Sequence, residues 1–246
     1  MNYVANCSFG KDSLAMVLLL LEKELPLTEV IFFDTGMEFQ AIYRNRDKLI
    51  PLLRERGVKY TELKPDRPFL YDMLEKPVTS KKNSTHYGYG WCGGVCRWGT
   101  SNKTRISERY LSQYGNNVTE YVGIAYDEPD RIKEKNYPLV EYKMTEKDCL
   151  KFCRDRGWDW CEGHIDLYDI LDRVSCWCCA NKNKKELYNI FLYLPSYWNK
   201  LKELQSQISK PMKTYKSKKH GEYGNLFAME KIFIQKRSEW LDKLLA

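Results

Sequence analysis

Hydrophobic and polar positions in the first half of the chain follow two different spacings. Short, mostly apolar runs predict buried strands, and longer segments with apolar residues at helical spacing predict helices between them. The expected strands cover 3–6, 29–33, 58–63 and 118–125, and the expected helices cover 14–21, 38–56 and a segment that ends near 114. Three strand–helix units in succession indicate an α/β fold with a doubly wound parallel sheet.

The pattern changes after the third strand and again near the C-terminus. Residues 65–98 lack periodicity and are rich in Gly and aromatic residues from 84 to 91, which predicts a long functional loop. Helices are expected over 183–192, 198–208 and 228–245, and the Lys-rich segment 210–219 is expected to be a solvated basic loop. We therefore divide the chain into an α/β domain, 1–194, and a helical, basic and aromatic extension, 195–246.

Composition narrows the class of protein. The chain has 246 residues and a net charge of +7, which suits a polyanionic ligand, although a solvated basic surface gives the same balance. The N-terminus shows no secretory signal and no apolar stretch reaches transmembrane length, so we expect a cytoplasmic protein without membrane contact. Nine cysteines are many for a compartment where disulfides are rare, and some are therefore candidates for metal binding.

The first candidate binding segment joins the first strand to the first helix. It contains Ser8, Gly10, Lys11 and Ser13. A helix N-terminus carries free N–H groups and a partial positive charge, so this turn can hold phosphate. Gly10 lets the backbone approach an anion closely, and Lys11 adds a charge. The common phosphate loop G-x-x-x-x-G-K-[ST] is absent, and an ordinary strand-to-helix turn is the alternative.

Further candidates follow the second and fourth strands. Asp34 lies where the second strand ends, an edge of the sheet that binds ligands in open α/β folds, and it either accepts from ribose hydroxyls or only caps the next helix. Arg131 offers a bidentate donor for phosphate or sulfate, or it only pairs with Glu128 three residues earlier. Lys103 lies in the first turns of the helix that ends near 114, another candidate anion site.

Three of these segments resemble the PP-loop superfamily, in particular its branch of PAPS reductase-like proteins. Residues 8–13 (S-F-G-K-D-S) are similar to the S-x-G-K-D-S signature, 34–36 (D-T-G) to the nucleotide pocket, and 123–131 (G-I-A-Y-D-E-P-D-R) to the segment after the fourth strand. The superfamily includes sulfonucleotide reductases and tRNA-thiolating enzymes. The resemblance covers about 2–191 and implies a Rossmann-like sheet of about five strands. It also implies nucleotide binding within 1–194 by Ser8, Phe9, Gly10, Lys11, Asp12, Ser13, Asp34, Thr35, Gly36 and Gly123.

Two closely spaced cysteine pairs, Cys92-x-x-x-Cys96 and Cys176-x-x-Cys179, are candidate metal ligands. Such spacings let both thiolates of a pair face one centre. The layout resembles the assimilatory APS reductases, in which a Cys–Cys pair and a distant C-x-x-C hold a [4Fe–4S] cluster. The first pair is wider here, so the metal stays open between such a cluster and Zn²⁺. Four separate buried cysteines are the alternative, and Cys178 is a substitute ligand.

The remaining cysteines receive other interpretations. A helix start is expected at Thr145 with Asp148 in the capping-box position, and Cys149 and Cys153 on that helix are assigned to packing. Cys161 is a further candidate nucleophile or metal ligand, because His164 nearby is a group that can lower the pKa of its thiol.

The resemblance implies an enzyme that binds ATP with Mg²⁺ and splits it between the α- and β-phosphates to adenylate an acceptor, which suits sulfur transfer. Lys11, Asp12, Lys103 and Arg131 are the expected catalytic residues. The acceptor is open among tRNA, DNA and a small molecule, and the oligomeric state is open, with a homodimer as one option. One alternative is a PAPS or APS reductase, which needs a nucleophilic thiol that we cannot assign. Another is a nucleotide-sensing or nucleic-acid-binding module with a structural metal.

Overall fold

The structure, a computed structural model, describes residues 1–79, 84–217 and 221–245. Its strands are β1 (Asn2–Asn6), β2 (Glu29–Phe33), β3 (Lys59–Leu63), β4 (Pro77–Thr79), β5 (Thr85–Tyr87), β6 (Val118–Val122), β7 (Cys161–Glu162), β8 (Ile165–Asp166), β9 (Tyr215–Ser217) and β10 (Gly221–Tyr223). Its α-helices are α1 (Lys11–Glu22), α2 (Gln40–Glu55), α3 (Asn102–Leu111), α4 (Pro138–Glu141), α5 (Glu146–Arg154), α6 (Leu167–Ile170), α7 (Lys184–Tyr193), α8 (Pro195–Gln207) and α9 (Leu226–Leu245). Short π-helical turns cover Tyr71–Glu75 and Arg97–Ser101.

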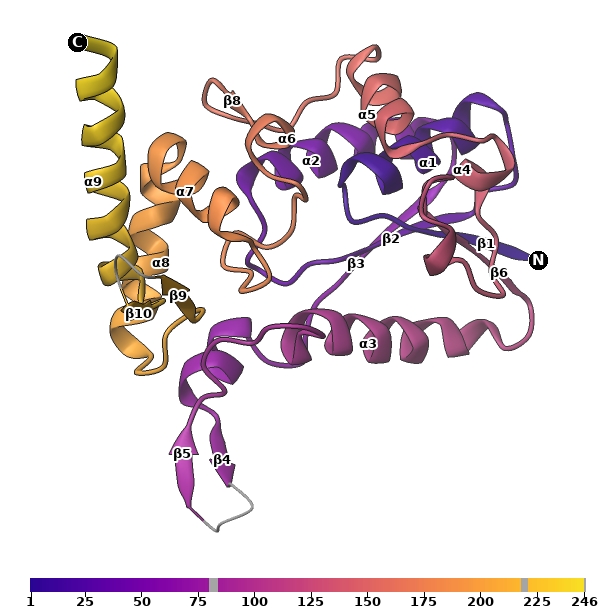
Figure 1. Cartoon of the computed structure of the whole chain (residues 1–246). Helices are drawn as coiled ribbons and strands as arrows, with labels where there is room; N and C mark the ends of the chain where they lie inside the picture. The colour runs from indigo at the N-terminus through magenta and orange to yellow at the C-terminus, as the bar shows by residue number, and fades with distance from the viewer. Residues whose placement is uncertain (80–83, 218–220, 246) are drawn as a thin grey trace.

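The four long strands form one parallel sheet in the order β3-β2-β1-β6. From β1 the chain moves outward through α1 to β2 and through α2 to β3. It then crosses back through α3 and places β6 on the other side of β1. Helices α1 and α2 cover one face of the sheet and α3 covers the other (Figure 1). The predicted doubly wound α/β fold is confirmed, and its switch point lies between β1 and β6, where such folds bind ligands.

The sheet has four strands where the resemblance implied about five. A single parallel bridge between Asn136 and Tyr121 of β6 marks the place where a fifth strand would lie. The pairing cannot extend, because Pro138 lacks an N–H group and begins α4 two residues later. After β6 the chain therefore continues into α4 and α5.

The two irregular segments contain more structure than the sequence predicts. Within 65–98, β4 and β5 form an antiparallel hairpin that projects from the body of the molecule (Figure 1). Within the basic segment 210–219, Tyr215–Ser217 forms β9 and pairs with β10, while 218 and 219 lie outside the described residues. Among the described residues, no helix is both long and apolar enough to cross a membrane.

The hydrophobic core is continuous from the sheet to the C-terminal helices. One cluster of buried side chains includes Phe32 of β2, Trp160 before β7, Leu201 of α8 and Phe233 of α9. Helix α8 packs on both α7 and α9, at the left of Figure 1. The predicted division at residue 194 thus falls between two helices that are in contact, α7 and α8.

One carboxylate lies buried at the start of β2. Glu29 is 2% exposed and accepts hydrogen bonds from Tyr110 (2.7 Å) and Tyr114 (2.6 Å), and Lys59 lies 3.1 Å away. Burial by itself raises the pKa of Glu29, but these donors stabilise the charged form and hold the pKa below its ordinary value of 4.5. The residue therefore ties α3 and the following turn to the edge of the sheet.

Because the pKa of Glu29 is lowered in the folded state, its contribution to stability is complete above about pH 4.5 and is lost as the pH falls through the folded pKa. We expect Glu29→Gln to lower the free energy of unfolding by about 2 kcal/mol near neutral pH, because two hydrogen bonds to a charged group are weakened. The difference from the wild type should shrink at about pH 4. Urea unfolding at both pH values measures it, with exposed Glu55→Gln as the control; a gap that stays constant with pH would contradict the assignment.

Candidate functional site

The turn between β1 and α1 has a strained backbone that the core holds in place. Phe9 has φ +58°, a conformation that bulky residues rarely adopt. Its ring is fully buried and packs edge-on against Phe32, with ring centroids 5.0 Å apart. Its carbonyl accepts a 2.7 Å hydrogen bond from the indole Nε1 of Trp160. A left-handed residue in such a turn can direct successive N–H groups to one side, as an anion site requires.

The first turn of α1 adds further donors. Gly10 is the N-cap and has no side chain to accept from the N–H groups of the helix. The N–H of Lys11 donates to the Tyr168 hydroxyl at 2.8 Å. Ser13 Oγ accepts from the Ser8 N–H at 3.1 Å and lies 3.1 Å from Ser8 Oγ, which fixes the shape of the turn.

The end of β6 approaches this turn at backbone contact. A Cβ atom on Gly123 would lie 2.7 Å from the Cα of Ser13, so only glycine fits there. The segment after Gly123 consequently places Glu128 and Arg131 beside the first turn of α1. Arg131 donates to both carboxylate oxygens of Glu128 at 2.5 Å, and Arg173 reaches the same carboxylate at 3.5 Å.

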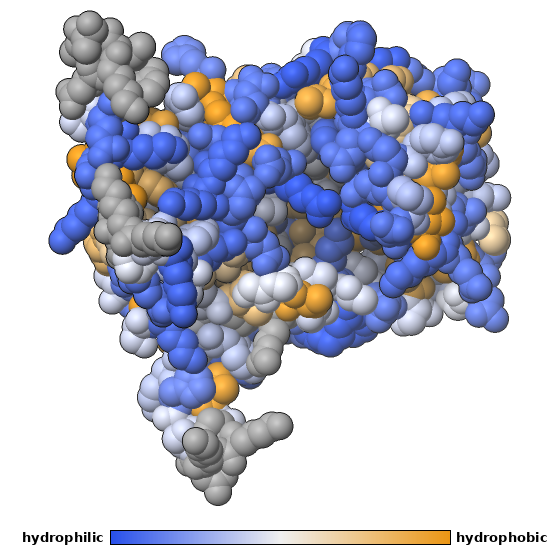
Figure 2. All heavy atoms as spheres, viewed as in Figure 1, coloured by the Kyte–Doolittle hydropathy of each residue, from blue (hydrophilic) through white to orange (hydrophobic). Residues whose placement is uncertain are grey.

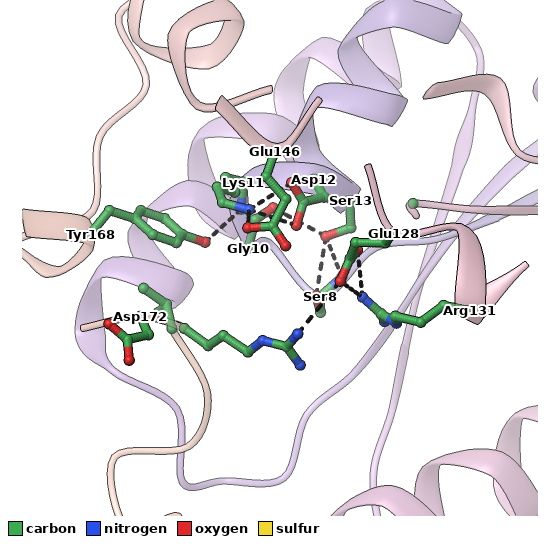
Figure 3. Close-up of a pocket in the computed structure, with 13 residues that line it drawn as sticks. Ser8, Gly10, Lys11, Asp12, Ser13, Glu128, Arg131, Glu146, Tyr168 and Asp172 are labelled. Carbon is green, nitrogen blue, oxygen red and sulfur yellow. Dashed lines mark hydrogen bonds and ion pairs between the residues drawn. The ribbon is translucent and has the colours of Figure 1, made fainter. Parts of the chain in front are cut away.

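These groups surround a pocket of about 180 Å³, the loop pocket (Figure 3). Its lining residues are Ser8, Gly10, Lys11, Asp12, Ser13, Gly123, Glu128, Arg131, Glu146, Tyr168, Asp172, Arg173 and Val174. Six of the predicted nucleotide-binding residues and the predicted catalytic Arg131 therefore lie together. Phe9 does not line the pocket, because it is buried beneath the turn.

Charges of both signs meet in the loop pocket. The ammonium of Lys11 lies 2.9 Å from Asp12 and 2.8 Å from Glu146. Burial alone lowers the pKa of Lys11, but the two carboxylates outweigh it and raise that pKa. Burial raises the pKa of Asp12, and Lys11 only partly opposes it. One carboxylate oxygen each from Asp12, Glu128 and Glu146 lie within 4.8 Å of one another.

A larger cavity of about 740 Å³, the cysteine cavity, adjoins the loop pocket and shares Ser8, Arg131, Asp172, Arg173 and Val174 with it. Figure 2 shows a hollow in the middle of this face, with hydrophobic atoms visible at its bottom. The four predicted ligands Cys92, Cys96, Cys176 and Cys179 line it, as does Cys178. The two cysteine pairs, far apart in sequence, therefore face one space.

A single asparagine ties the two cysteine loops together. Asn181 Oδ1 accepts from the N–H of Gly94 at 2.7 Å, and Asn181 Nδ2 donates to the carbonyl of Gly94 at 2.8 Å. Gly94 lies between Cys92 and Cys96, and Asn181 follows Cys179 by two residues. This reciprocal pair fixes the separation of the loops without any metal.

The thiols are spaced more widely than one ion needs. Zn–S bonds of about 2.3 Å in a tetrahedron hold sulfurs roughly 3.8 Å apart. No three of the cysteine sulfurs in the described part of the chain lie within 4.8 Å of one another. A four-iron cluster bonds each thiolate to a different iron, so its ligands stand farther apart. The thiols would therefore have to move closer together to hold one ion, and the four residues can supply ligands to a cluster or to Zn²⁺.

The cysteine cavity also contains charged groups. Cys176 lies 3.5 Å from Thr35 Oγ1 and donates to Glu38 Oε1 at 3.4 Å. Burial raises the pKa of Cys176, so a cation is needed to favour its thiolate. Burial also lowers the pKa of Lys103, which lines the cavity from α3. Lys182 is 2% exposed and donates to Ser175 Oγ at 3.1 Å.

Asp34 and Gly36, both predicted to bind nucleotide, line neither of these two cavities. Asp34 is buried, and its Oδ1 accepts from the N–H of Gly36 and from the Tyr43 hydroxyl, each at 2.8 Å. The carboxylate therefore shapes the turn after β2. Thr35 of the same turn does line the cysteine cavity.

The other cysteines line neither the loop pocket nor the cysteine cavity. Cys149 and Cys153 are fully buried on α5, which begins with the predicted capping box of Thr145 and Asp148. Cys161 lines neither cavity, and partial burial followed by the charge of Asp159 raises the pKa of its thiol. A raised pKa disfavours the thiolate that a nucleophile needs, and a role of His164 in lowering it stays a prediction.

Sequence reasoning missed several residues of the loop pocket. Glu146 is the first residue of α5. The capping box predicted where this helix begins, but it did not predict that Glu146 forms an ion pair with Lys11. Tyr168 and Arg173 come from the segment around α6, where no local motif marks them. They reach the loop because Trp160 packs against Tyr168, with centroids 4.9 Å apart, and bonds to Phe9.

Comparison with known proteins gives a family and distant relatives. A family model described as the phosphoadenosine phosphosulfate reductase domain matches residues 2–159. Two uncharacterised proteins of Methanocaldococcus jannaschii are similar. One is 25% identical over 208 residues, which are 78% of this chain and 39% of the relative. The other is 26% identical over 209 residues, which are 81% of this chain and 47% of the relative. The chain thus spans less than half the length of these curated relatives.

Among solved structures, the U34-tRNA thiolase NcsA from Methanococcus maripaludis with its [4Fe-4S] cluster is similar, with a TM-score of 0.43 and 13% sequence identity. The match covers 85% of this chain and 70% of that chain.

The bond between Asn181 and Gly94 predicts a role in holding the cysteine loops together. We expect Asn181→Ala to lower the melting temperature of the metal-free protein by a few degrees, because it removes two hydrogen bonds worth about 1 kcal/mol each. Alkylation of Cys92 and Cys96 should also become faster, since their loop is released. Mass spectrometry of timed alkylation measures this, with exposed Asn199→Ala as the control. Equal alkylation rates in wild type and Asn181→Ala would refute the role.

Proposed function

The chain belongs to the phosphoadenosine phosphosulfate reductase domain family, and we propose that it binds ATP at the loop pocket and splits it between the α- and β-phosphates to adenylate an acceptor. The proposal rests on one observation: the loop pocket contains both a site for phosphate oxygens and a site for a divalent cation. A cradle of backbone N–H groups around Gly10 suits phosphate oxygens, and three converging carboxylates suit a divalent cation. A triphosphate with Mg²⁺ needs both.

The residues of the loop pocket have separate tasks in this proposal. The N–H groups of the first turn of α1, the hydroxyls of Ser8 and Ser13, and Lys11 hold phosphate oxygens. Tyr168 accepts a hydrogen bond from the Lys11 N–H at 2.8 Å, and its own hydroxyl proton is available to a phosphate oxygen. Mg²⁺, when bound near Asp12, Glu128 and Glu146, neutralises charge on the phosphates.

The proposed step is a displacement at the α-phosphorus. A bond forms between an acceptor oxygen and that phosphorus, the bond to the oxygen that bridges the α- and β-phosphates breaks, and pyrophosphate leaves with the electron pair. Arg131 and Arg173 both pair with Glu128 at the boundary of the two cavities. From there their guanidinium groups can pair with the departing phosphates instead. Lys103 lies on α3 in the adjoining cavity and offers a further positive charge. A sulfur or nitrogen nucleophile then displaces AMP from the acceptor.

The cysteine cavity supplies the second part of the proposal. Cys92, Cys96, Cys176 and Cys179, which line one cavity in two closely spaced pairs, hold a [4Fe–4S] cluster. The cavity adjoins the loop pocket, so the cluster and the activated acceptor share one space. The acceptor belongs to the class of tRNA, DNA or small molecules that receive sulfur.

Sulfonucleotide reduction is the alternative within the family. It needs a thiol that reaches the sulfonate and a second thiol that releases sulfite. Four of the five cysteines on the cavity wall are assigned to the cluster, and burial raises the pKa of the fifth, Cys178. Cys161 lies outside both cavities and also has a raised pKa. These placements favour the ATP-dependent reaction over reduction.

The nucleotide proposal predicts a loss of ATP binding in Gly10→Val. The backbone of Gly10 (φ −72°, ψ 164°) accommodates valine, but the new side chain would meet Tyr168 Oη and Ser8 Oγ inside the loop pocket. We expect at least a roughly tenfold loss of affinity, and a loss of about fivefold in Tyr168→Phe, which removes one hydrogen bond. Calorimetry with ATP and Mg²⁺ measures both, with exposed Tyr142→Phe as the control.

Unchanged ATP affinity in a folded Gly10→Val protein would refute the nucleotide site. Sulfite release from PAPS or APS in the presence of thioredoxin, abolished by Cys161→Ser, would instead support the reductase.

The cluster proposal predicts iron and sulfide in protein purified without oxygen. The double variant Cys176→Ala, Cys179→Ala should lose both together with thermal stability, because the energy of metal binding is also folding energy. Cys149→Ala is the matched control, since it removes a buried core thiol and should lower stability while keeping the iron. Full iron content in the double variant would contradict the assignment of these cysteines. Zinc without iron in the wild type would show that the site holds a single ion and not a cluster.

A further inference from the structure

A third cavity, of about 550 Å³, lies on the other side of the segment that carries Cys176 and Cys178. Trp177 lines this cavity, whereas its neighbours in sequence line the cysteine cavity. Glu38 is the only residue that lines both among the described residues. No residue of the loop pocket lines the third cavity, so its ligand is separate from the nucleotide. We call it the Trp177 cavity.

Three aromatic side chains with fixed positions form much of its wall. Trp177 and Tyr197 lie with ring centroids 6.2 Å apart, and the backbone N–H of Trp177 donates to Met37 O at 3.0 Å. The hydroxyl of Tyr197 accepts from the Gln40 N–H at 3.1 Å. The hydroxyl of Tyr43 donates to Asp34 at 2.8 Å. Because their polar ends are held, the ring faces form a preformed surface in a cavity of a size that suits a small ligand.

The charge of the cavity is negative. Glu38, Glu75 and Glu203 line it, against a single cation, Lys200. Both hydrogen bonds that Glu38 accepts from Thr35 and Cys176 go to Oε1, so they leave Oε2 for another donor. Aromatic faces and carboxylates together disfavour phosphate and favour a positive group.

The chain already places a cation on these rings. Lys200 Nζ lies 5.0 Å from the ring centroid of Tyr197 and 5.9 Å from that of Trp177. Lys200 is exposed and forms no ion pair with the described residues, so its ammonium can leave the rings at little cost. Its present position shows that the aromatic surface accepts an alkylammonium group.

We propose that the Trp177 cavity binds an organic cation, an alkylammonium or guanidinium group, which replaces the ammonium of Lys200 on Trp177 and Tyr197 and is balanced by the glutamates of the wall. The positive group comes from a free amine or from a lysine or arginine side chain of a polypeptide, which present the same chemistry. The site lies beyond the proposed adenylation, since its residues and the loop pocket do not overlap. Its ligand would lie next to the cysteine cavity, across Glu38.

The test is calorimetric titration of the full chain with arginine, with its neutral isostere citrulline, with spermidine, and with a short arginine-containing peptide. We expect the cations to bind and citrulline not to bind, with an affinity that falls as salt is raised. Lys200→Ala should tighten the binding severalfold, because it removes a competing like charge from the rings. Glu203→Gln on the exposed face of α8 should weaken it severalfold. Lys210→Ala and Glu55→Gln, both exposed and outside the cavity, are the matched controls.

The difference between Lys200→Ala and Lys210→Ala separates this site from unspecific attraction, since both variants lose one positive charge and only Lys200 lies on the rings. Binding of free arginine or spermidine indicates a small amine, and binding of the peptide alone indicates a polypeptide source; both support the site. Equal binding of citrulline and arginine, weaker binding in Lys200→Ala, or no binding of any of the cations would overturn the proposal. An unaltered ATP affinity in these variants keeps the result independent of the nucleotide site.

Discussion

The close approach of two backbones at the switch point of the sheet determines the arrangement of the candidate site. The end of β6 passes the first turn of α1 so closely that a Cβ on Gly123 would overlap Ser13. Side chains separate the backbones of most packed helices and strands, but here the backbone at Gly123 lies directly against the backbone of Ser13. The segment after β6 therefore cannot be displaced without opening the sheet, and it delivers Glu128 and Arg131 to the donors at the start of α1.

The same constraint explains why a strained turn persists beside it. Phe9 adopts a positive φ at a cost of order 1–3 kcal/mol, which only a surrounding structure that over-determines the position can offset. Phe32 fills the space around its ring from below, and Trp160 bonds its carbonyl from the segment before β7. Trp160 in turn packs edge-on against Tyr168, so the position of the Tyr168 hydroxyl depends on the same side chain that holds the carbonyl of Phe9.

Local patterns in the sequence predicted the elements and the loop, but not the partners that complete the site. The strand–helix alternation and the residues from Ser8 to Ser13 are encoded within a few neighbours, as is the capping box at Thr145 and Asp148. Glu146, Tyr168 and Arg173 reach the loop only through long-range packing, which single-sequence patterns do not contain. Asp34 was expected to face a nucleoside because it ends a strand, but its own turn and Tyr43 occupy its Oδ1. Pro138 prevents the bridge at Asn136 from extending toward the C-terminus into a fifth strand.

The three cavities differ in the charges that line them, and they therefore suit ligands of different charge. The loop pocket places Lys11, Arg131 and Arg173 among the carboxylates of Asp12, Glu128, Glu146 and Asp172, a mixture that suits an anion together with a divalent cation. The cysteine cavity shares Arg131 and Arg173 and adds Lys103 and Lys182. The Trp177 cavity has three glutamates and one lysine, so it repels the same anions. Glu38 and the segment from Cys176 to Cys178 form the wall between the two kinds of environment. A cation in the Trp177 cavity would therefore be separated from the loop pocket, with which that cavity shares no lining residue.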